Sequence, residues 1–340
     1  MTRCLRKACI RYYTLPRQPS RQYDAAAIAT RIHDWEKGIM ERCTVELDTI
    51  TASQYTSMCM TLDRPLPPRP CPLPACGTPL PANWHLAYFP ARLRESQLAA
   101  DGYEPEWQPP PPFDRRVWAS GRLKWWPANA LRIGDRAQQE TRCRSVNVKE
   151  GSVGTTVFVT TEQLVRNARG PVLTDERCLA YMSTDVKPSP PRSKLMILMH
   201  AARIANRVAE FSRTLEPTPI MLFRYSALTF NSHRIHYDHQ YATVEEGYPA
   251  PLVHGPLTCT LLLGLLEEQL HHHRAQTLHI DSFTYRAISP LYCGRPLTLH
   301  GRWSTSAEAD ADPGRLKCHL WATNEQGGLA MSGTATLEAS

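Results

Sequence analysis

The 340-residue sequence has no hydrophobic run long enough to cross a membrane. Its longest strongly apolar stretch, residues 257–266, contains threonine, cysteine and glycine and falls well short of the roughly 20 residues that a transmembrane helix needs. Apolar residues still make up 42% of the chain, enough to build hydrophobic cores. The composition therefore argues against a disordered or fibrous protein, and the length suits two domains.

The cysteine and histidine patterns do not favour a metal site or a disulfide framework. The 11 cysteines are odd in number and include no Cys-x-x-Cys pair, the nearest approach being Cys71 and Cys76 in a proline-rich segment. Reduced thiols are the expected state. The consecutive histidines 271–273 would point about 100° apart on a helix and cannot converge on one ion. We expect neither a metal nor a cofactor.

Acidic residues are absent from residues 1–23, which contain six lysine and arginine side chains. These six account for most of the net charge of +7 and leave +1 for the rest of the chain. So small a charge offers no broad surface for nucleic acid. An arginine-rich start without a continuous apolar run predicts a mitochondrial transit peptide over residues 1–23. The alternative is a disordered basic tail on a cytoplasmic protein.

The first half of the remaining chain, residues 24–187, combines helices with a run of strands. Ile28, Ile32, Trp35 and Ile39 form the apolar stripe of an amphipathic helix over about 25–43. A weaker helical pattern covers 49–62, and eight prolines in 64–81 then end regular structure. Predicted strands follow at 117–125, 138–148, 155–162 and 178–182. The proline-containing stretch 188–194 is the candidate linker between the two domains.

The second half, residues 188–340, contains the most apolar helix pattern of the chain. This helix spans 257–270 and is apolar on nearly every face, so we expect it to be buried. Predicted strands lie at 208–214, 220–226, 282–287, 296–303, 315–323 and 328–337. A long buried helix followed by several antiparallel strands predicts an α+β arrangement in which a sheet surrounds a helix.

Ionisable and amide side chains are concentrated in residues 223–238, after the predicted strand at 220–226. Asn231 and His236 are five positions apart, so a turn between them is needed if they are to meet one substrate. A structural role is the alternative, because His233 and Tyr237 can brace a short helix and Asn231 can cap it.

The tripeptide His254-Gly255-Pro256 opens the buried helix. Free backbone N–H groups and the positive end of the helix dipole at such a position stabilise negative charge, and Gly255 lets a ligand come close. This is the chemistry of an oxyanion hole. Gly-Pro is also common where helices simply begin, which is the alternative interpretation.

Together these motifs resemble a known family. Residues 225–238, 246–249 and 252–257, and later 283–294, are similar to the catalytic half of hydroxyacyl-thioester dehydratase type 2 and of mesaconyl-C4-CoA hydratases, within the MaoC-like hot-dog superfamily. In the first half, residues 84–89, 115–119 and 149–159 are similar to the same family. The resemblance covers roughly residues 25–340.

The resemblance implies a double hot-dog fold with two antiparallel sheets, each wrapped around a central helix. It implies catalytic groups in 188–340, whereas 24–187 would shape the acyl pocket. The implied reaction is reversible hydration of 2-enoyl thioesters carried by CoA or acyl carrier protein, and we also expect that the chain can form a homodimer. His236 would be the acid/base, Asn231 would orient the water, and the Gly255 N–H would bind the thioester oxygen.

The sequence departs from the broader Asp-x-Asn-Pro-x-His hydratase motif. With that histidine aligned on His236, Asn231 replaces the aspartate and His233 replaces the asparagine. An amide cannot accept a proton, so His236 acts alone or with His233, Asp238 or His254. Expected substrate-binding residues are Tyr225, Arg224, Arg234, Tyr248 and Arg286. A hot-dog thioesterase and a catalytically silent acyl-binding subunit are the alternative functions.

Overall fold

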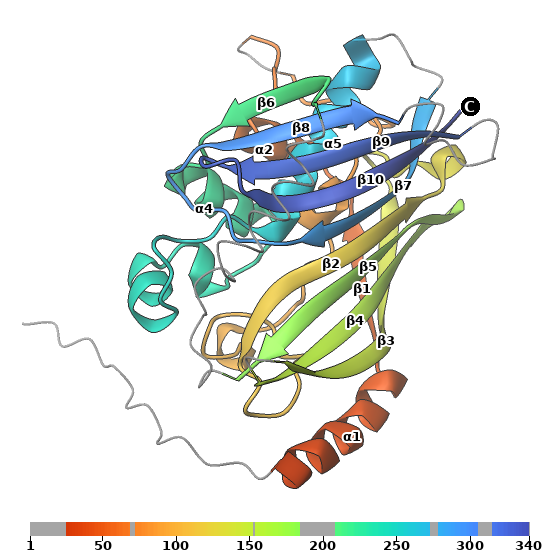
Figure 1. The fold of residues 1–340 in the computed structure, drawn as a ribbon. Coiled ribbons are helices and arrows are strands. Elements are labelled where there is room, and N and C mark those ends of the chain that lie inside the picture. The colour runs from red at the N-terminus through yellow and green to blue at the C-terminus, as the bar shows by residue number, and fades with distance from the viewer. Residues whose placement is uncertain are drawn as a thin grey trace, which may run out of the picture.

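The computed structural model describes residues 25–68, 72–151, 154–183, 208–272, 278–304 and 315–339 (Figure 1). The predicted transit peptide and the candidate linker at 188–194 lie outside the described residues. Among the helices of the described ranges, none is both long enough and apolar enough to span a bilayer.

Four α-helices are present in the described part of the chain: α1 (Ala25–Glu41), α2 (Ala52–Thr61), α4 (Pro219–Leu228) and α5 (Gly255–His272). Short 3₁₀ turns lie at Trp84–Ala87, Glu95–Gln97, Pro127–Asn129 and Arg234–His236, and a π-helical turn lies at Tyr241–Glu245. Three predicted helices are confirmed, because α1, α2 and α5 overlap the ranges 25–43, 49–62 and 257–270.

The strands form one continuous ten-stranded antiparallel sheet in the order β1-β3-β4-β5-β2-β7-β10-β9-β8-β6. Their bounds are β1 Cys43–Thr49, β2 Arg115–Trp125, β3 Arg136–Gly151, β4 Gly154–Asn167, β5 Gly170–Met182, β6 Phe211–Leu215, β7 Leu278–Ala287, β8 Leu297–Trp303, β9 Arg315–Asn324 and β10 Leu329–Ala339. Each half contributes five strands in the same order: first, third, fourth, fifth, second. The structure therefore has one large sheet where the resemblance implied two.

The two halves join where β2 pairs with β7 (Figure 1). This antiparallel seam runs from the Ser120–Arg286 pair to the Lys124–Ser282 pair. The helix α5 packs against β7, β8 and β9, with Leu257 and Leu262 fully buried. One hydrophobic core crosses the seam, because it includes Trp84 of the first half. A smaller core lies between α1 and the far ends of β3 and β4.

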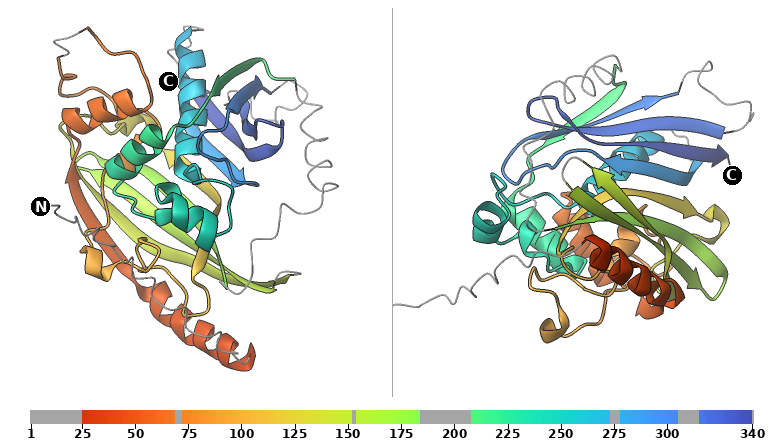
Figure 2. Two further views of the ribbon diagram at one scale, coloured as in Figure 1. Left: turned by 90° about the vertical axis from the view of Figure 1, so that its left-hand side faces the viewer. Right: turned by 60° about the horizontal axis from the view of Figure 1, so that its bottom comes forward.

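The strand predicted at 220–226 is wrong, because these residues form the helix α4. The Thr218 side chain caps the helix by accepting the Met221 N–H at 3.1 Å, and Pro219 occupies the first turn. A short apolar run fits a strand and a helix equally well, so periodicity alone misassigned it. Figure 2 shows α4 beside α2, which it contacts. The segment 229–237 consequently follows a helix and not a strand.

The strand β1 was missed by the sequence pattern. Its burial alternates along Cys43–Thr49, but the more exposed positions include Val45 and Leu47, which are 52% and 59% exposed. A half-buried strand is recognised in a sequence because apolar residues on its buried face alternate with polar residues on its exposed face. In β1 the exposed face carries apolar residues, so this alternation is missing from the sequence.

Candidate active site

His236 lies in the 3₁₀ turn that follows α4, and its ring is fixed by the backbone. Its Nδ1 lies 2.9 Å from the carbonyl oxygen of Leu252. A carbonyl can only accept, so Nδ1 donates its hydrogen and the neutral ring keeps the lone pair on Nε2. The Leu252 N–H in turn donates to Ile235 O at 3.0 Å. This reciprocal contact places the His236 turn beside the segment that leads into α5.

Three histidine rings are gathered at this point. The rings of His236 and His254 are stacked, with centroids 3.7 Å apart and planes 22° apart. The His233 ring stands edge-on to His236 at 5.5 Å. Behind them, His254 Nε2 and the Ser226 hydroxyl share a hydrogen bond of 2.8 Å, and His233 Nε2 lies 3.4 Å from a carboxylate oxygen of Asp101. The sequence segments 231–238 and 254–256 therefore meet.

Burial keeps these rings neutral. It lowers the pKa of His236 to about 4 despite the hydrogen bond to Leu252 O. Burial and the neighbouring His236 ring hold the pKa of His233 and of His254 well below the usual range. At neutral pH His236 is therefore an unprotonated base with a defined tautomer.

Asn231 follows a sharp reversal of the chain. Phe230 has a φ of 51°, in the left-handed region, and ends α4. The Asn231 N–H then donates to Ser226 O at 2.9 Å, and its side-chain oxygen accepts the His233 N–H at 3.1 Å. The side chain thus forms a local turn but does not cap the short helix that follows, whose N-cap residue is His233, and it also lines the large cavity described below.

Gly255 is the first residue of α5, so no residue one turn earlier in the helix can accept its N–H. It immediately follows His254, on which His236 stacks. A Cβ atom on Gly255 would lie 3.0 Å from Cγ of Trp118, a residue of the first half. Trp118 is itself held by a hydrogen bond from its indole N–H to the Tyr285 hydroxyl, at 2.9 Å. Any side chain at position 255 would therefore press against this indole at the start of α5.

A cavity of about 620 Å³ begins at Trp118 and Pro256 and extends over the inner face of the first-half sheet. The second half contributes Ser226, Asn231 and Pro256 to its wall, and the first half contributes Trp118 and Arg177. Both halves of the chain therefore build this space. Asn231 lines it, whereas His236 and Gly255 lie next to lining residues and are not part of its wall.

The remaining predicted residues lie in different places. Tyr225 is buried, lines the cavity and hydrogen-bonds Thr260 through its hydroxyl at 3.3 Å. Asp238 is occupied locally, because it pairs with Arg234 at 2.9 Å and accepts the Tyr241 N–H at 3.0 Å. Those contacts stabilise the turn and account for Asp238 and Arg234 without substrate.

Three other predicted substrate-binding residues are not among those lining the cavity. Arg224 is exposed on α4. Arg286 is exposed on β7, and the alternation of side chains along a strand puts it on the sheet face opposite the buried Tyr285. Tyr248 packs 6.5 Å from Tyr292, measured between ring centroids. The sequence signal had selected these residues by type, without information about which face they occupy.

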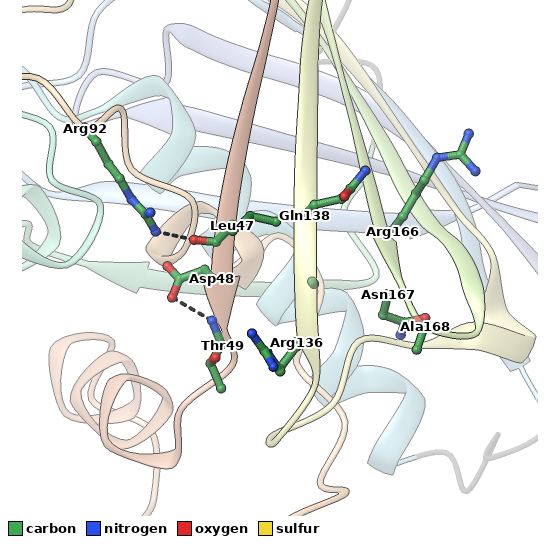
Figure 3. Close-up of a pocket in the computed structure, with 10 residues that line it drawn as sticks. Leu47, Asp48, Thr49, Arg92, Arg136, Gln138, Arg166, Asn167 and Ala168 are labelled. Carbon is green, nitrogen blue, oxygen red and sulfur yellow. Dashed lines mark hydrogen bonds between the residues drawn. The ribbon is translucent and has the colours of Figure 1, made fainter.

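A second cavity of about 630 Å³ lies at the outer end of β1, β3 and β4 (Figure 3). Three arginines, Arg92, Arg136 and Arg166, stand around it, and Arg92 donates to the Leu47 carbonyl. None of the predicted catalytic residues is part of its wall. The other cavity includes Asn231 in its wall.

Comparison with known proteins agrees with this site. The family model for hydroxyacyl-thioester dehydratase type 2 matches residues 83–293, which include the histidine cluster and the start of α5. The chain belongs to this family. It is 33% identical to a mesaconyl-C(4)-CoA hydratase from Chloroflexus aurantiacus, over 89% of this chain and 98% of the relative. Family membership makes the chain a hydro-lyase.

Further relatives agree in sequence and in fold. A mitochondrial hydroxyacyl-thioester dehydratase type 2 from Schizosaccharomyces pombe is 27% identical over 79% of this chain and 95% of its own length. A solved MaoC-like dehydratase superposes with a TM-score of 0.63 at 12% identity, covering 89% of this chain and 99% of its own. One from Phytophthora capsici gives 0.59 at 13% identity, covering 91% and 99%. These solved structures show that the family member described here has the MaoC-like hot-dog fold.

Proposed function

We propose that this hydro-lyase reversibly hydrates 2-enoyl thioesters to 3-hydroxyacyl thioesters, with His236 as the acid/base and the Gly255 N–H as the oxyanion donor. The observation that carries the proposal is the neutral His236 ring, whose donor nitrogen is engaged by Leu252 O and whose basic nitrogen is free to act beside the start of α5. The names of the two curated relatives support the same reaction class.

The geometry supports the following sequence of steps. His236 Nε2 takes a proton from a water molecule as its oxygen bonds to C3 of the enoyl thioester. The double-bond electrons move toward the thioester oxygen, where the Gly255 N–H and the α5 dipole stabilise the negative charge. The imidazolium then gives its proton to C2, which completes the addition of water. Dehydration follows the same path in reverse.

Asn231 orients the water in this proposal, since its side chain lines the cavity and is itself positioned by the His233 N–H. His233 and His254 assist by holding the His236 ring in position. His233 packs against the edge of this ring, and His254 stacks on its face. Asp238 has no part in the proton transfer, because its contacts to Arg234 and Tyr241 hold it in the turn.

The repeated strand order supports interpretation of the chain as a double hot dog, in which residues 24–187 and 188–340 are the two units. The second unit wraps its strands against α5 and supplies the candidate catalytic groups. In this interpretation the first unit supplies the wall of the acyl pocket.

We also infer that residues 1–23 direct the protein to mitochondria, as the name of the S. pombe relative suggests. Imaging a fluorescent fusion with and without these residues tests this.

An assay with crotonyl-CoA and mesaconyl-CoA tests the reaction. Loss of the enoyl absorbance without release of free thiol is the expected result. Thiol release without loss of the enoyl group would instead show a thioesterase. Binding of these thioesters without either change would show a silent acyl-binding protein.

A further inference from the structure

A loop of the first half holds the turn that carries His236. The loop contains Asp101, whose carbonyl oxygen accepts the Arg234 N–H at 2.8 Å. The carboxylate of the same residue approaches the histidine cluster, because its Oδ2 lies 3.4 Å from Nε2 of His233. His233 in turn packs against the ring of His236. Asp101 is therefore connected to His236 through one intervening side chain.

Gly102 lets the loop and the turn approach this closely. Its φ is 81°, in the left-handed region, and an added Cβ atom would overlap the carbonyl oxygen of Ser232. The Ser232 hydroxyl donates to the Gly102 carbonyl at 2.6 Å. A side chain at position 102 would push the loop away from the turn, and Asp101 would move with it.

Asp101 is a buried carboxylate with a fixed orientation. Its side chain is 9% exposed, and its Oδ1 accepts the Tyr103 N–H at 3.0 Å. Its Oδ2 accepts a hydrogen bond of 2.7 Å from Nη2 of Arg116, whose side chain is 3% exposed. The Arg116 guanidinium also lies over the Tyr103 ring, 4.7 Å from its centre. One carboxylate oxygen thus contacts both a buried cation and the histidine cluster.

The proposed reaction places a positive charge on this cluster, because His236 becomes an imidazolium when it takes a proton from water. A buried cation is costly unless a negative group lies near it. Asn231 stands where the broader hydratase motif has an aspartate, and its amide carries no charge. Asp238 follows on the same turn but pairs with Arg234 at 2.9 Å.

We propose that Asp101 is a positioning residue of the hydratase site, which orients the His236 ring through His233 and stabilises the positive charge that His236 acquires. The inference rests on the proposed function, because it takes His236 as the acid/base. The first half thereby supplies a negative charge that position 231 lacks.

The other ionisable groups near Asp101 and the histidines supply no such charge at neutral pH. Burial raises the pKa of four tyrosines and of one carboxyl group: Tyr103, Tyr181, Tyr225, Tyr241 and Glu104. Arg234 and Asp238 offset each other in their ion pair. Burial, the His236 ring and the Arg116 cation together lower the pKa of His233. Asp101 offsets that cation, so removal of either member of the Asp101–Arg116 pair should shift the histidines in opposite directions.

The first test is steady-state kinetics of Asp101→Asn with crotonyl-CoA. The amide keeps the shape of the side chain and an acceptor oxygen, but leaves the Arg116 cation unopposed. We expect kcat to fall at least about tenfold while KM changes less than about twofold. Asp281→Asn is the matched control, because Asp281 is also buried and pairs with Lys124 across the seam between the halves. It should change neither constant.

The second test reads the charge of the cluster by NMR titration of ¹⁵N-labelled histidine rings. In Arg116→Met the Asp101 carboxylate faces the cluster without its cation. The pKa of His236, about 4 in the unmodified protein, should then rise by at least about one unit, and that of His233 should rise with it. In Asp101→Asn neither pKa should rise. Asp101→Asn combined with Arg116→Met leaves no unpaired buried charge and should lie between the single variants.

Equal shifts in the two single variants, or none, would overturn the inference if both proteins keep the circular dichroism of the unmodified chain. The pH profile of kcat/KM provides the same comparison in the working enzyme. Its acid limb should move to higher pH in Arg116→Met and should not do so in Asp101→Asn.

A comparison with His236→Ala separates this inference from the proposed reaction. Asp101→Asn should slow the unmodified enzyme but should not slow His236→Ala further, because the carboxylate acts through His236. Equal slowing in both backgrounds would overturn the role of Asp101. Unchanged kinetics in Asp101→Asn beside an inactive His236→Ala would also overturn it and leave the reaction in place. A fully active His236→Ala would instead remove the proposed mechanism, while opposite NMR shifts would still support the contact between Asp101 and the cluster.

Discussion

The imidazole rings of His236 and His254 lie face to face, 3.7 Å between centroids. Two rings so close cannot both carry a positive charge at low cost, and burial already disfavours the charge on each. The pair therefore offers one proton position, on His236, whose other nitrogen is engaged by the Leu252 carbonyl. This arrangement defines both the protonation state and the direction in which the ring can act.

Replacement of His236 by alanine should lower turnover roughly 10²-fold or more, because the proposed mechanism assigns the proton transfer from water to His236. The measurement is the initial rate of loss of enoyl absorbance with a saturating enoyl-CoA. His239→Ala is the control, since His239 is exposed three residues away and should leave the rate unchanged. A fully active His236→Ala protein would remove this residue from the mechanism.

Stability should decrease as the pH falls below about 6.5. Burial lowers the pKa of folded His236 to about 4, whereas the unfolded side chain titrates near 6.5, so the unfolded state binds more protons between these values. The free energy of unfolding from urea titrations should therefore be smaller at about pH 5 than at about pH 7. In His236→Gln this loss should be smaller, although His85, His233 and His254 still contribute to it. An unchanged loss in that variant would show that His236 is not buried in its neutral form.

Asn231→Asp should keep activity, while Asn231→Ala should lose most of it. A carboxylate oxygen can still accept the His233 N–H that the amide oxygen accepts at 3.1 Å, so the turn is preserved. The new carboxylate also restores the acidic group that stands here in the broader hydratase motif. Steady-state kinetics of the two variants provide the comparison, and similar losses in both would mean that the amide itself is required.

Gly255→Val should block the site without unfolding the protein. Even the first added carbon would lie 3.0 Å from Trp118 Cγ, and the branched atoms would displace the indole or cover the start of α5. We expect kcat/KM to fall at least about tenfold while the thermal unfolding midpoint changes little. Gly38→Ala in α1 is the control, because nothing lies within 4 Å of its added carbon. Wild-type kinetics in Gly255→Val would contradict the oxyanion role.

Much of the fold was predictable because its elements have strong local patterns. The uniformly apolar run of α5 indicated a buried helix, and most strands of both halves were placed within a few residues. The exceptions are β1, which was missed, and β5, which begins eight residues before the predicted range 178–182. The helix α4 was not predicted, since Ile220 and Phe223 are 64% and 65% exposed and its apolar run carries no clear period. The sheet order was also beyond local patterns, because pairing of β2 with β7 joins segments more than 150 residues apart in sequence.

The site was predictable only within the second half. The motif residues at 231–236 and 254–255 identified the two segments that meet. Trp118, Arg177 and Asp101 reach the site or its cavity from the first half, through contacts that no spacing in the sequence reveals. Arg286 was predicted to bind substrate because it lies in a motif that matches the family. In the structure it lies on the exposed face of β7 instead.

The seam between β2 and β7 makes the cavity a property of a single molecule. Its walls come from two five-stranded units that a covalent chain and a backbone ladder keep together, so dilution cannot separate them. Catalytic specific activity should therefore be independent of enzyme concentration. Only one of the two units has to preserve the histidines, which leaves the other free to change its lining and, with it, the acyl groups that the enzyme accepts.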